Sequence, residues 1–204
     1  MQDEAWTSRS VKARLALLSA RDAFPDIYPL LEQDCRHVLC SMDEAIPLSG
    51  PTGESNELYV EPRGAFVVFV EPNFPWQTVL PIVVTRLLLA GNSVEIGSVD
   101  NVSILRFFSG LLALLPDGVL SINERNRINL DDAGVVCLGD IAFTDCFRQQ
   151  ITQRQGAIIP LIWVNSMESS IISPYAAIQW VHERTRTVNC TAIGGNASLL
   201  ALNE

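Results

Sequence analysis

The chain has 204 residues and a mass of 22.4 kDa, enough for one domain with a full hydrophobic core. Apolar residues make up 48% and charged residues 18%, a balance that excludes disordered, collagen-like and coiled-coil chains. The 14 basic and 23 acidic residues give a formal net charge of -9. Because a phosphate backbone would be repelled by this charge, we expect no binding of nucleic acid.

The longest apolar run, residues 78–91, is interrupted by Pro81 and Arg86 and is shorter than the ~20 residues of a membrane span. Asp3 and Glu4 make the N-terminus unlike a signal peptide. The cysteines are odd in number and irregularly spaced: Cys35, Cys40, Cys137, Cys146 and Cys190. This pattern is typical of reduced thiols, so we expect a cytoplasmic protein without a transmembrane segment.

Residues 1–47 are expected to form a helical N-terminal segment or linker. Two groups of apolar residues recur there at helical spacing: Val11, Leu15, Leu17 and Leu18, then Ile27, Leu30, Leu31 and Cys35. Residues 50–56 are rich in Gly and Pro, and we expect no regular structure in them. The main domain is therefore placed over residues 48–204.

Short apolar runs alternate with helical patterns in the rest of the chain. The expected strands are 58–60, Ala65–Val70, Ser93–Gly97, 118–122, 134–138, 157–164 and 187–191. The expected helices are 75–90, 104–115, Ile141–Gln153 and 174–183. Because the strands carry almost no polar alternation, they should be buried on both faces. The sequence predicts an α/β fold with a Rossmann-like parallel sheet covered by helices on both faces.

A dinucleotide site would be expected in the turn after the strand Ala65–Val70. The phosphate-binding Gly-x-Gly-x-x-Gly turn is absent, and residues 71–76 read Glu-Pro-Asn-Phe-Pro-Trp. Pro72 and Pro75 remove backbone donors that a phosphate would need. We therefore expect a connection that packs and binds no cofactor.

Cys35, His37 and Cys40 are close enough in sequence to suggest a metal site. Positions 35, 37 and 40 do not share one face of a helix, and no second pair lies nearby. We expect no metal there, and we expect His182, near a predicted helix end, to be solvated or to cap the helix.

Carboxylates supply several acid–base candidates: Glu95, Asp131, Asp132, Asp140, Asp145 and Glu168. Asp140 follows the predicted strand 134–138, at the edge where α/β proteins bind ligands. It is equally placed to cap the helix that begins at Ile141, which is the interpretation we favour. Among the thiols, Cys137 lies within a buried strand and is a poor nucleophile candidate. Cys146 lies on a helix and Cys190 in the final strand, and neither has a histidine close in sequence.

The C-terminal segment is unusual for a tail, because it is poor in charge after residue 186. It combines a strand with a bend at Gly194, Gly195 and Asn196, and Asn189 adds a further amide. Such a segment favours docking against another surface over fraying.

Two motifs of the chain resemble the C-terminal region of the proline utilization A (PutA) family. Residues 50–56 read Gly-Pro-Thr-Gly-Glu-Ser-Asn, and residues 188–199 contain Val-Asn followed by Gly-Gly-Asn-Ala-Ser-Leu. Their order and separation are similar to those of the family, and the resemblance covers most of residues 48–200. PutA proteins are bifunctional flavin- and NAD-dependent enzymes that oxidise proline to glutamate.

The resemblance implies a domain of aldehyde-dehydrogenase-superfamily fold, with a small β-flap, that performs no chemistry. In long PutA proteins, the β-flap and the C-terminal motif pack on the pyrroline-5-carboxylate dehydrogenase domain of the same chain, and they help to close a substrate-channelling tunnel. FAD and NAD then belong to the parent enzyme, and this chain holds no cofactor, metal or catalytic residue. By position, the docking motif within residues 188–200 is Val188, Asn189, Gly194, Gly195, Asn196, Ala197, Ser198 and Leu199.

The residues themselves agree with an inactive domain, because the Glu-Leu-Gly-Gly and Gly-Gln-x-Cys contexts of active aldehyde dehydrogenases are absent. The alternative is a small stand-alone NAD-binding protein or vestigial aldehyde dehydrogenase, which the Rossmann-like pattern and Asp140 favour. The sequence leaves open whether the chain also forms a homo-oligomer.

Overall fold

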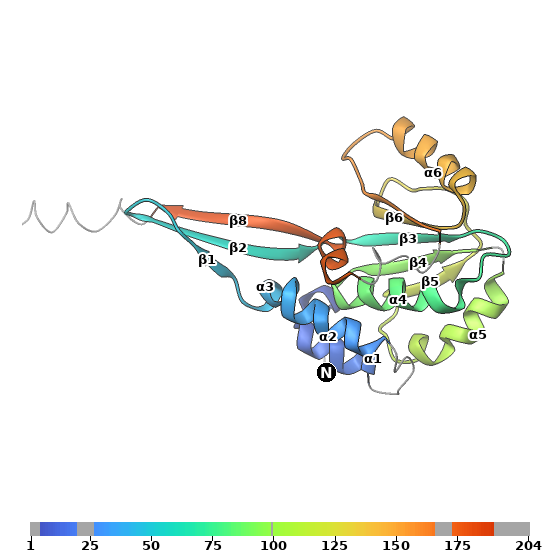
Figure 1. Cartoon of the computed structure of the whole chain (residues 1–204), viewed down its shortest axis with the longest axis horizontal. Coiled ribbons are helices and arrows are strands. Elements are labelled where there is room, and N and C mark those ends of the chain that lie inside the picture. The colour runs from blue at the N-terminus through green and yellow to red at the C-terminus, as the bar shows by residue number, and fades with distance from the viewer. Residues whose placement is uncertain (1–4, 20–26, 99, 166–172, 190–204) are drawn as a thin grey trace, which may run out of the picture.

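Two sheets organise the computed structural model, which describes residues 5–19, 27–98, 100–165 and 173–189 (Figure 1). The body contains a five-stranded parallel sheet of β3 (Ala65–Val70), β4 (Ser93–Gly97), β5 (Leu120–Asn123), β6 (Asp132–Leu138) and β7 (Leu161–Val164). A three-stranded antiparallel sheet, here called the arm, projects from the body and consists of β1 (Ile46–Leu48), β2 (Glu54–Pro62) and β8 (Val181–Asn189).

The body sheet has the strand order β5-β4-β3-β6-β7. The first strand of this sheet along the chain is the central strand β3. The next two, β4 and β5, lie on one side of it, and β6 and β7 then lie on the other side. The strand order therefore reverses between β3 and β6, as in doubly wound α/β folds. The predicted Rossmann-like parallel sheet is confirmed.

Helices cover both faces of this sheet: α4 (Trp76–Leu89) and α5 (Asn101–Leu112) on one, and α6 (Ile141–Gln153) on the other. Phe66 and Val68 of β3 pack in the core with α4 and α5, and Val67 and Phe69 pack with α6. The Phe69 ring stacks on Phe147 of α6 with 3.9 Å between ring centroids. Burial on both faces explains why β3 shows no polar alternation.

The N-terminal helices pack on the outer side of α4, and they are η1 (Trp6–Ser8), α1 (Val11–Ser19), α2 (Tyr28–His37) and α3 (Cys40–Asp43). The Trp6 indole N–H donates to the Leu88 carbonyl at 3.1 Å. Asp34 of α2 and Arg86 of α4 form an ion pair in which each side chain is 1% exposed. The N-terminal segment thus shares the body's main core, and the division into residues 1–47 and 48–204 stays a prediction.

The helix predicted over residues 174–183 is wrong in part. A 3₁₀-helix, η2 (Pro174–Trp180), ends at Trp180, and β8 begins at Val181. Pairing with β2 along nine residues overrides local helix propensity here. The same pairing corrects the expectation for residues 50–56, because Glu54, Ser55 and Asn56 belong to β2.

One helix boundary also differs from the prediction. Helix α5 begins at Asn101 instead of residue 104, since the Asp100 carboxylate caps it by accepting from the Ser103 N–H at 3.4 Å. Helix α4 agrees with the predicted helix over residues 75–90 and continues through Pro81, which lacks the N–H for one intrahelical hydrogen bond. Among the helices described, none has the length and apolar character needed to cross a bilayer.

Candidate functional site

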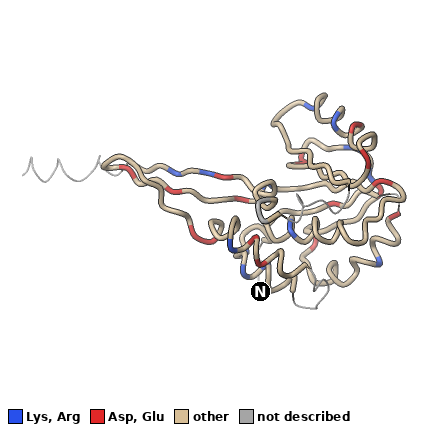
Figure 2. Tube along the Cα trace, in the orientation of Figure 1, with Lys and Arg blue, Asp and Glu red and all other residues tan. Residues whose placement is uncertain are grey.

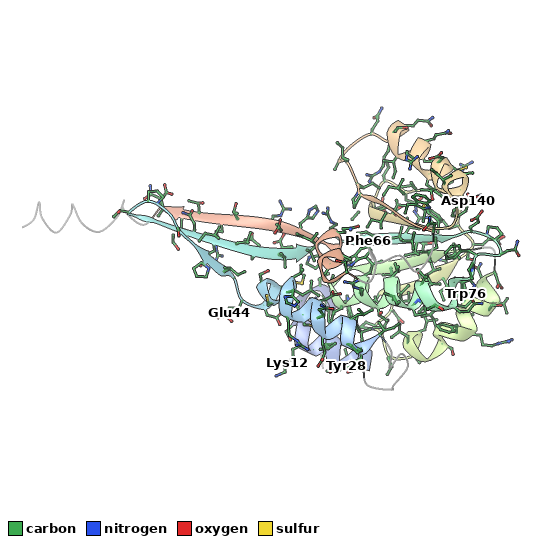
Figure 3. All side chains as sticks on the ribbon, viewed as in Figure 1. Lys12, Tyr28, Glu44, Phe66, Trp76 and Asp140 are labelled. Carbon is green, nitrogen blue, oxygen red and sulfur yellow. The ribbon has the colours of Figure 1, made fainter. Side chains whose placement is uncertain are left out.

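The carboxyl edge of the body sheet is where α/β proteins usually bind ligands. Figure 3 shows Asp140 and Trp76 at this edge, at the end of the body opposite the arm. A pocket of about 510 Å³ opens there between the turn after β3 and the residues that follow β4.

Glu71 fills the crevice between the ends of β3 and β6. Its Oε2 accepts a hydrogen bond from the Asp140 N–H at 2.8 Å, at the N-terminus of α6. A Cβ built on Gly139 would lie 2.7 Å from both Cβ and Oε2 of Glu71, so the two segments are in close contact. A carboxylate thus occupies the helix N-terminus that would otherwise favour a phosphate.

The N-terminus of α4 offers no better phosphate site. Pro75 stands at its N-cap without an N–H, and the Trp76 N–H donates to the Phe74 carbonyl at 2.8 Å. The pocket lining includes the carboxylates Glu71 and Asp100, and no Lys or Arg is among its described residues. The edge is electrostatically unfavourable for the pyrophosphate of a dinucleotide.

Asp140 caps α6, because its Oδ1 accepts from the Phe143 N–H at 2.8 Å. Two further candidate acids, Glu95 and Asp132, are both bridged by the Arg125 guanidinium, whose Nη1 lies 2.6 Å from Glu95 Oε2. These contacts give the three carboxylates structural partners.

The other candidate acids are not brought together. Asp145 lies half-exposed on α6 in an ion pair with Arg148, and Asp131 is exposed before β6. Glu168 lies outside the described residues. Within the part of the chain that the structure describes, Glu95 and Asp132 are the one pair of candidate carboxylates brought together, and Arg125 occupies the space between them.

The thiols show little nucleophilic character. Burial raises the pKa of Cys137 to about 12, and burial together with nearby Asp34 raises the pKa of Cys35 to about 11. Cys40 and Cys146 are exposed, and Cys190 lies outside the described residues.

The three residues considered as metal ligands are divided between two helices, and His182 lies on a strand. Cys35 and His37 lie on α2, whereas Cys40 begins α3, and no metal-binding group of three His, Cys, Asp or Glu side chains occurs among the residues described. His182 lies on β8 with its Nδ1 3.3 Å from Arg63 Nη1. Burial and the charge of Arg63 lower its pKa, and the expected helix end is instead a strand.

The arm is the second candidate site. Its central strand β2 pairs with β1, where Ile46 faces Leu58, and with β8 from Glu54–Asn189 to Pro62–Val181. Nine paired residues span about 30 Å at the rise of an antiparallel strand. The arm therefore extends well beyond the body (Figure 1).

The two faces of the arm differ in chemistry. Residues directly opposite each other in the register share a face. The central part of one face, here called the uncharged face, carries Ile46, Leu48, Asn56, Leu58, Thr185 and Thr187. The same side of the sheet continues to Glu54 at one end and to Glu183 at the other, and both are exposed. The other face carries the ion pairs of Glu57 with Arg186 and of Glu61 with Arg184. Figure 2 shows acidic and basic positions along the arm.

Apolar side chains of the arm remain accessible. Ile46 is 43% exposed and Leu48 is 41% exposed, and both lie on the uncharged face. Of the β2 residues only Val60 is buried. A sheet of three strands that leaves its apolar side chains open is typical of a surface that another surface covers.

The docking motif predicted from the sequence lies only partly in the described structure. Val188 and Asn189 end β8, opposite Ser55 and Glu54 of β2. Gly194, Gly195, Asn196, Ala197, Ser198 and Leu199 lie outside the described residues. Most of the arm was not predicted from the sequence. A signal for a strand was present in β8, where two residue types alternate: Arg184, Thr185, Arg186 and Thr187.

Comparison with known proteins identifies the fold. No family model and no curated protein matches the chain. Among solved structures, a mutant PutA of Bradyrhizobium japonicum matches with a TM-score of 0.63 and 24% identity, over 78% of this chain and 20% of that chain. A PutA of Bdellovibrio bacteriovorus matches with a TM-score of 0.59 and 16% identity, over 78% of this chain and 21% of that chain.

An aldehyde dehydrogenase shares the fold as well. The indole-3-acetaldehyde dehydrogenase of P. syringae, in complex with NAD+, matches with a TM-score of 0.62 and 15% identity, over 78% of this chain and 39% of that chain. The chain thus spans about a fifth of the length of the PutA chains it matches. The fold implied by the resemblance is confirmed, because the chain shares its fold with part of these PutA and aldehyde dehydrogenase chains.

Proposed function

We propose that this chain is a non-catalytic structural domain of a bifunctional enzyme that oxidises proline to glutamate. In this proposal it packs on the pyrroline-5-carboxylate dehydrogenase domain of the same parent and helps to close the tunnel that carries the intermediate. The observation that carries the proposal is the uncharged face of the arm, which exposes Ile46 and Leu48. The PutA structures of similar fold supply the parent's class.

The arm has the chemistry of a docking surface. Ile46 and Leu48 are already partly covered, so complete burial would contribute about 1 kcal/mol for each. Asn56 and Thr187 pair with each other at 2.6 Å across the strands. Covering the uncharged face itself therefore desolvates no ionic group, and Glu54 and Glu183 lie at its two ends. β8 is also the outer strand of its sheet within the described part of the chain, so a partner can pair with its edge over residues 181–187.

The proposal assigns FAD and NAD to other parts of the parent enzyme. The Glu71 carboxylate at the N-terminus of α6 supports this assignment, because it places negative charge where a dinucleotide phosphate would lie. A cytoplasmic location belongs to the same proposal. Without a parent, the uncharged face offers a surface for a second copy of the chain, which sedimentation of the isolated chain would detect.

The test uses the full-length enzyme that contains this domain. Replacing Ile46→Asp and Leu48→Asp together should introduce a lag before glutamate appears from proline, because intermediate escapes from an open tunnel. Val102→Asp is the matched control, since Val102 is 70% exposed on α5, away from the arm. Deleting residues 188–200 tests the C-terminal motif in the same assay. Coupled turnover without a lag in both the double variant and the deletion would contradict the proposal.

The alternative function, a stand-alone NAD-binding protein or vestigial aldehyde dehydrogenase, is favoured by the similar fold of a dehydrogenase in complex with NAD+. Calorimetric titration of the chain with NAD+ separates the two. No heat of binding up to millimolar NAD+ is expected from the domain proposed here. Saturable binding in the micromolar range would support the alternative.

A further inference from the structure

Arg14 of α1 is a buried cation with almost no hydrogen-bond acceptors. The residue is 1% exposed, and its Nε and Nη1 have no partner. Its Nη2 donates to the Met42 thioether sulfur at 3.4 Å, which is a weak acceptor. A buried guanidinium without acceptors is strongly destabilising, so its presence needs an explanation.

Arg86 shows how the same core treats another buried arginine. It is also 1% exposed, but its Nε and Nη2 lie 2.6 and 2.5 Å from the two carboxylate oxygens of Asp34. The two arginines lie on neighbouring helices, α1 and α4. The chain therefore provides a two-point carboxylate contact for one guanidinium and leaves the other with N–H groups to spare.

A pocket of about 500 Å³ adjoins Arg14, between α1, α3 and the end of β2 that joins the body. Arg9 also lines it, and the Arg9 Nε is buried without a partner. A Cβ built on Gly91 would lie 2.5 Å from Arg14 Nη1 and 2.8 Å from Pro62 Cγ, so Nη1 packs closely on Gly91 and near Pro62, which lines the pocket. This volume is within the range of small-molecule sites.

The acidic residues of the pocket are engaged elsewhere. Both carboxylate oxygens of Asp43 accept from the Val11 N–H, at 3.0 and 3.1 Å. Glu61 Oε2 accepts from Arg184 Nε at 3.3 Å. Burial lowers the pKa of Arg14 to about 10, opposed by the charge of Asp43, so Arg14 stays protonated at neutral pH.

We propose that this pocket binds a small molecule through an oxyanion, either a carboxylate or a phosphate group. Arg14 is the buried contact and Arg9 the second cation at the pocket. The Nε–H and Nη–H groups of a planar guanidinium match the oxygens of either group, and hydrogen bonds between charged groups are the strong ones. This site is independent of the docking face, and it lies at the end of the body sheet opposite the pocket beside Glu71.

The test is calorimetric titration of the 204-residue chain with inorganic phosphate and, separately, with acetate, at constant ionic strength set by chloride. Saturable binding of at least one anion is expected, and the one that binds identifies the class of ligand. Arg14→Met keeps the apolar stem and should weaken binding by about 10-fold or more. The matched control is Arg36→Met, which removes an exposed arginine of α2 and should leave the affinity unchanged.

Absence of saturable heat with both anions would overturn the proposal, as would equal affinity in the chain and its Arg14→Met variant. If that variant does not fold, Arg9→Gln replaces it, because Arg9 is only half-buried. The Arg9 variant should bind severalfold more weakly. An unchanged affinity in this variant would overturn the proposal.

Discussion

The body sheet and the arm are built from the same chain under opposite conditions. In the body, β3 has five of its six residues buried and is covered on both faces. In the arm, β8 is buried only at Val181, and all residues from Glu183 to Asn189 are exposed. The comparison indicates that the body carries most of the buried core that stabilises the domain, whereas the arm is largely exposed and is the surface that we propose for docking.

Substitution of Phe66 should produce the largest contrast between the two regions. Phe66 is 1% exposed and packs edge-on against Trp180, so Phe66→Ala should lower the free energy of unfolding by about 3–5 kcal/mol. Leu48→Ala in the arm should lower it by less than about 1 kcal/mol. Urea denaturation of both variants measures the difference, and equal losses would break the comparison.

Asp34 tests whether the N-terminal helices belong to the body. Asp34→Ala leaves Arg86 buried without its carboxylate and should destabilise the chain by about 3 kcal/mol, because an uncompensated buried charge remains. The double variant with Arg86→Met should recover much of this loss. If the single variant were as stable as the parent in thermal unfolding, α2 would not be part of the stable core.

The buried Cys137 thiol should make the free energy of unfolding depend on pH in the alkaline range. Its pKa is raised in the fold, so its contribution to stability is complete below about pH 9 and is lost as the pH rises toward about 12. Between about pH 8 and 10.5, the chain should lose about 2 kcal/mol more than its Cys137→Ala variant. Urea midpoints at the two pH values provide the measurement, and parallel losses would show that the β6 thiol is accessible to solvent.

The ion pairs of the arm should have the smallest effect. Glu57→Gln removes the partner of Arg186 on an exposed face, where water and salt screen the charges. The thermal midpoint of the variant should equal that of the unmodified chain, both at low salt and with added salt. A clear decrease would mean that the arm contributes to the stability of the body.

Local signals were sufficient to predict the body. Ala65–Val70 is a continuous apolar run, and Ile141–Gln153 follows the N-cap Asp140, so strand and helix were found with their observed bounds. β8 was not predicted as a whole, because it pairs with a strand more than 110 positions earlier. Its charged and hydroxyl residues gave no apolar pattern of their own.

Contacts between segments distant in the sequence also determine the properties of the two pockets. Glu71 meets the N–H of Asp140, 69 positions later, and no short motif encodes that contact. The missing acceptors of Arg14 became visible only once α3 and the end of β2 were placed around it. The absence of a glycine-rich turn after Val70 was, in contrast, evident in the sequence alone.

Hydrogen exchange of the arm tests the docking claim most directly. The amides of β8 would be measured in the isolated chain and in the native assembly purified from its source cells. We expect fast exchange along the β8 edge in the isolated chain and strong protection in the assembly, while β3 is protected in both. Equally fast exchange of β8 in the assembly would contradict the account, because the arm would then be uncovered where it should dock.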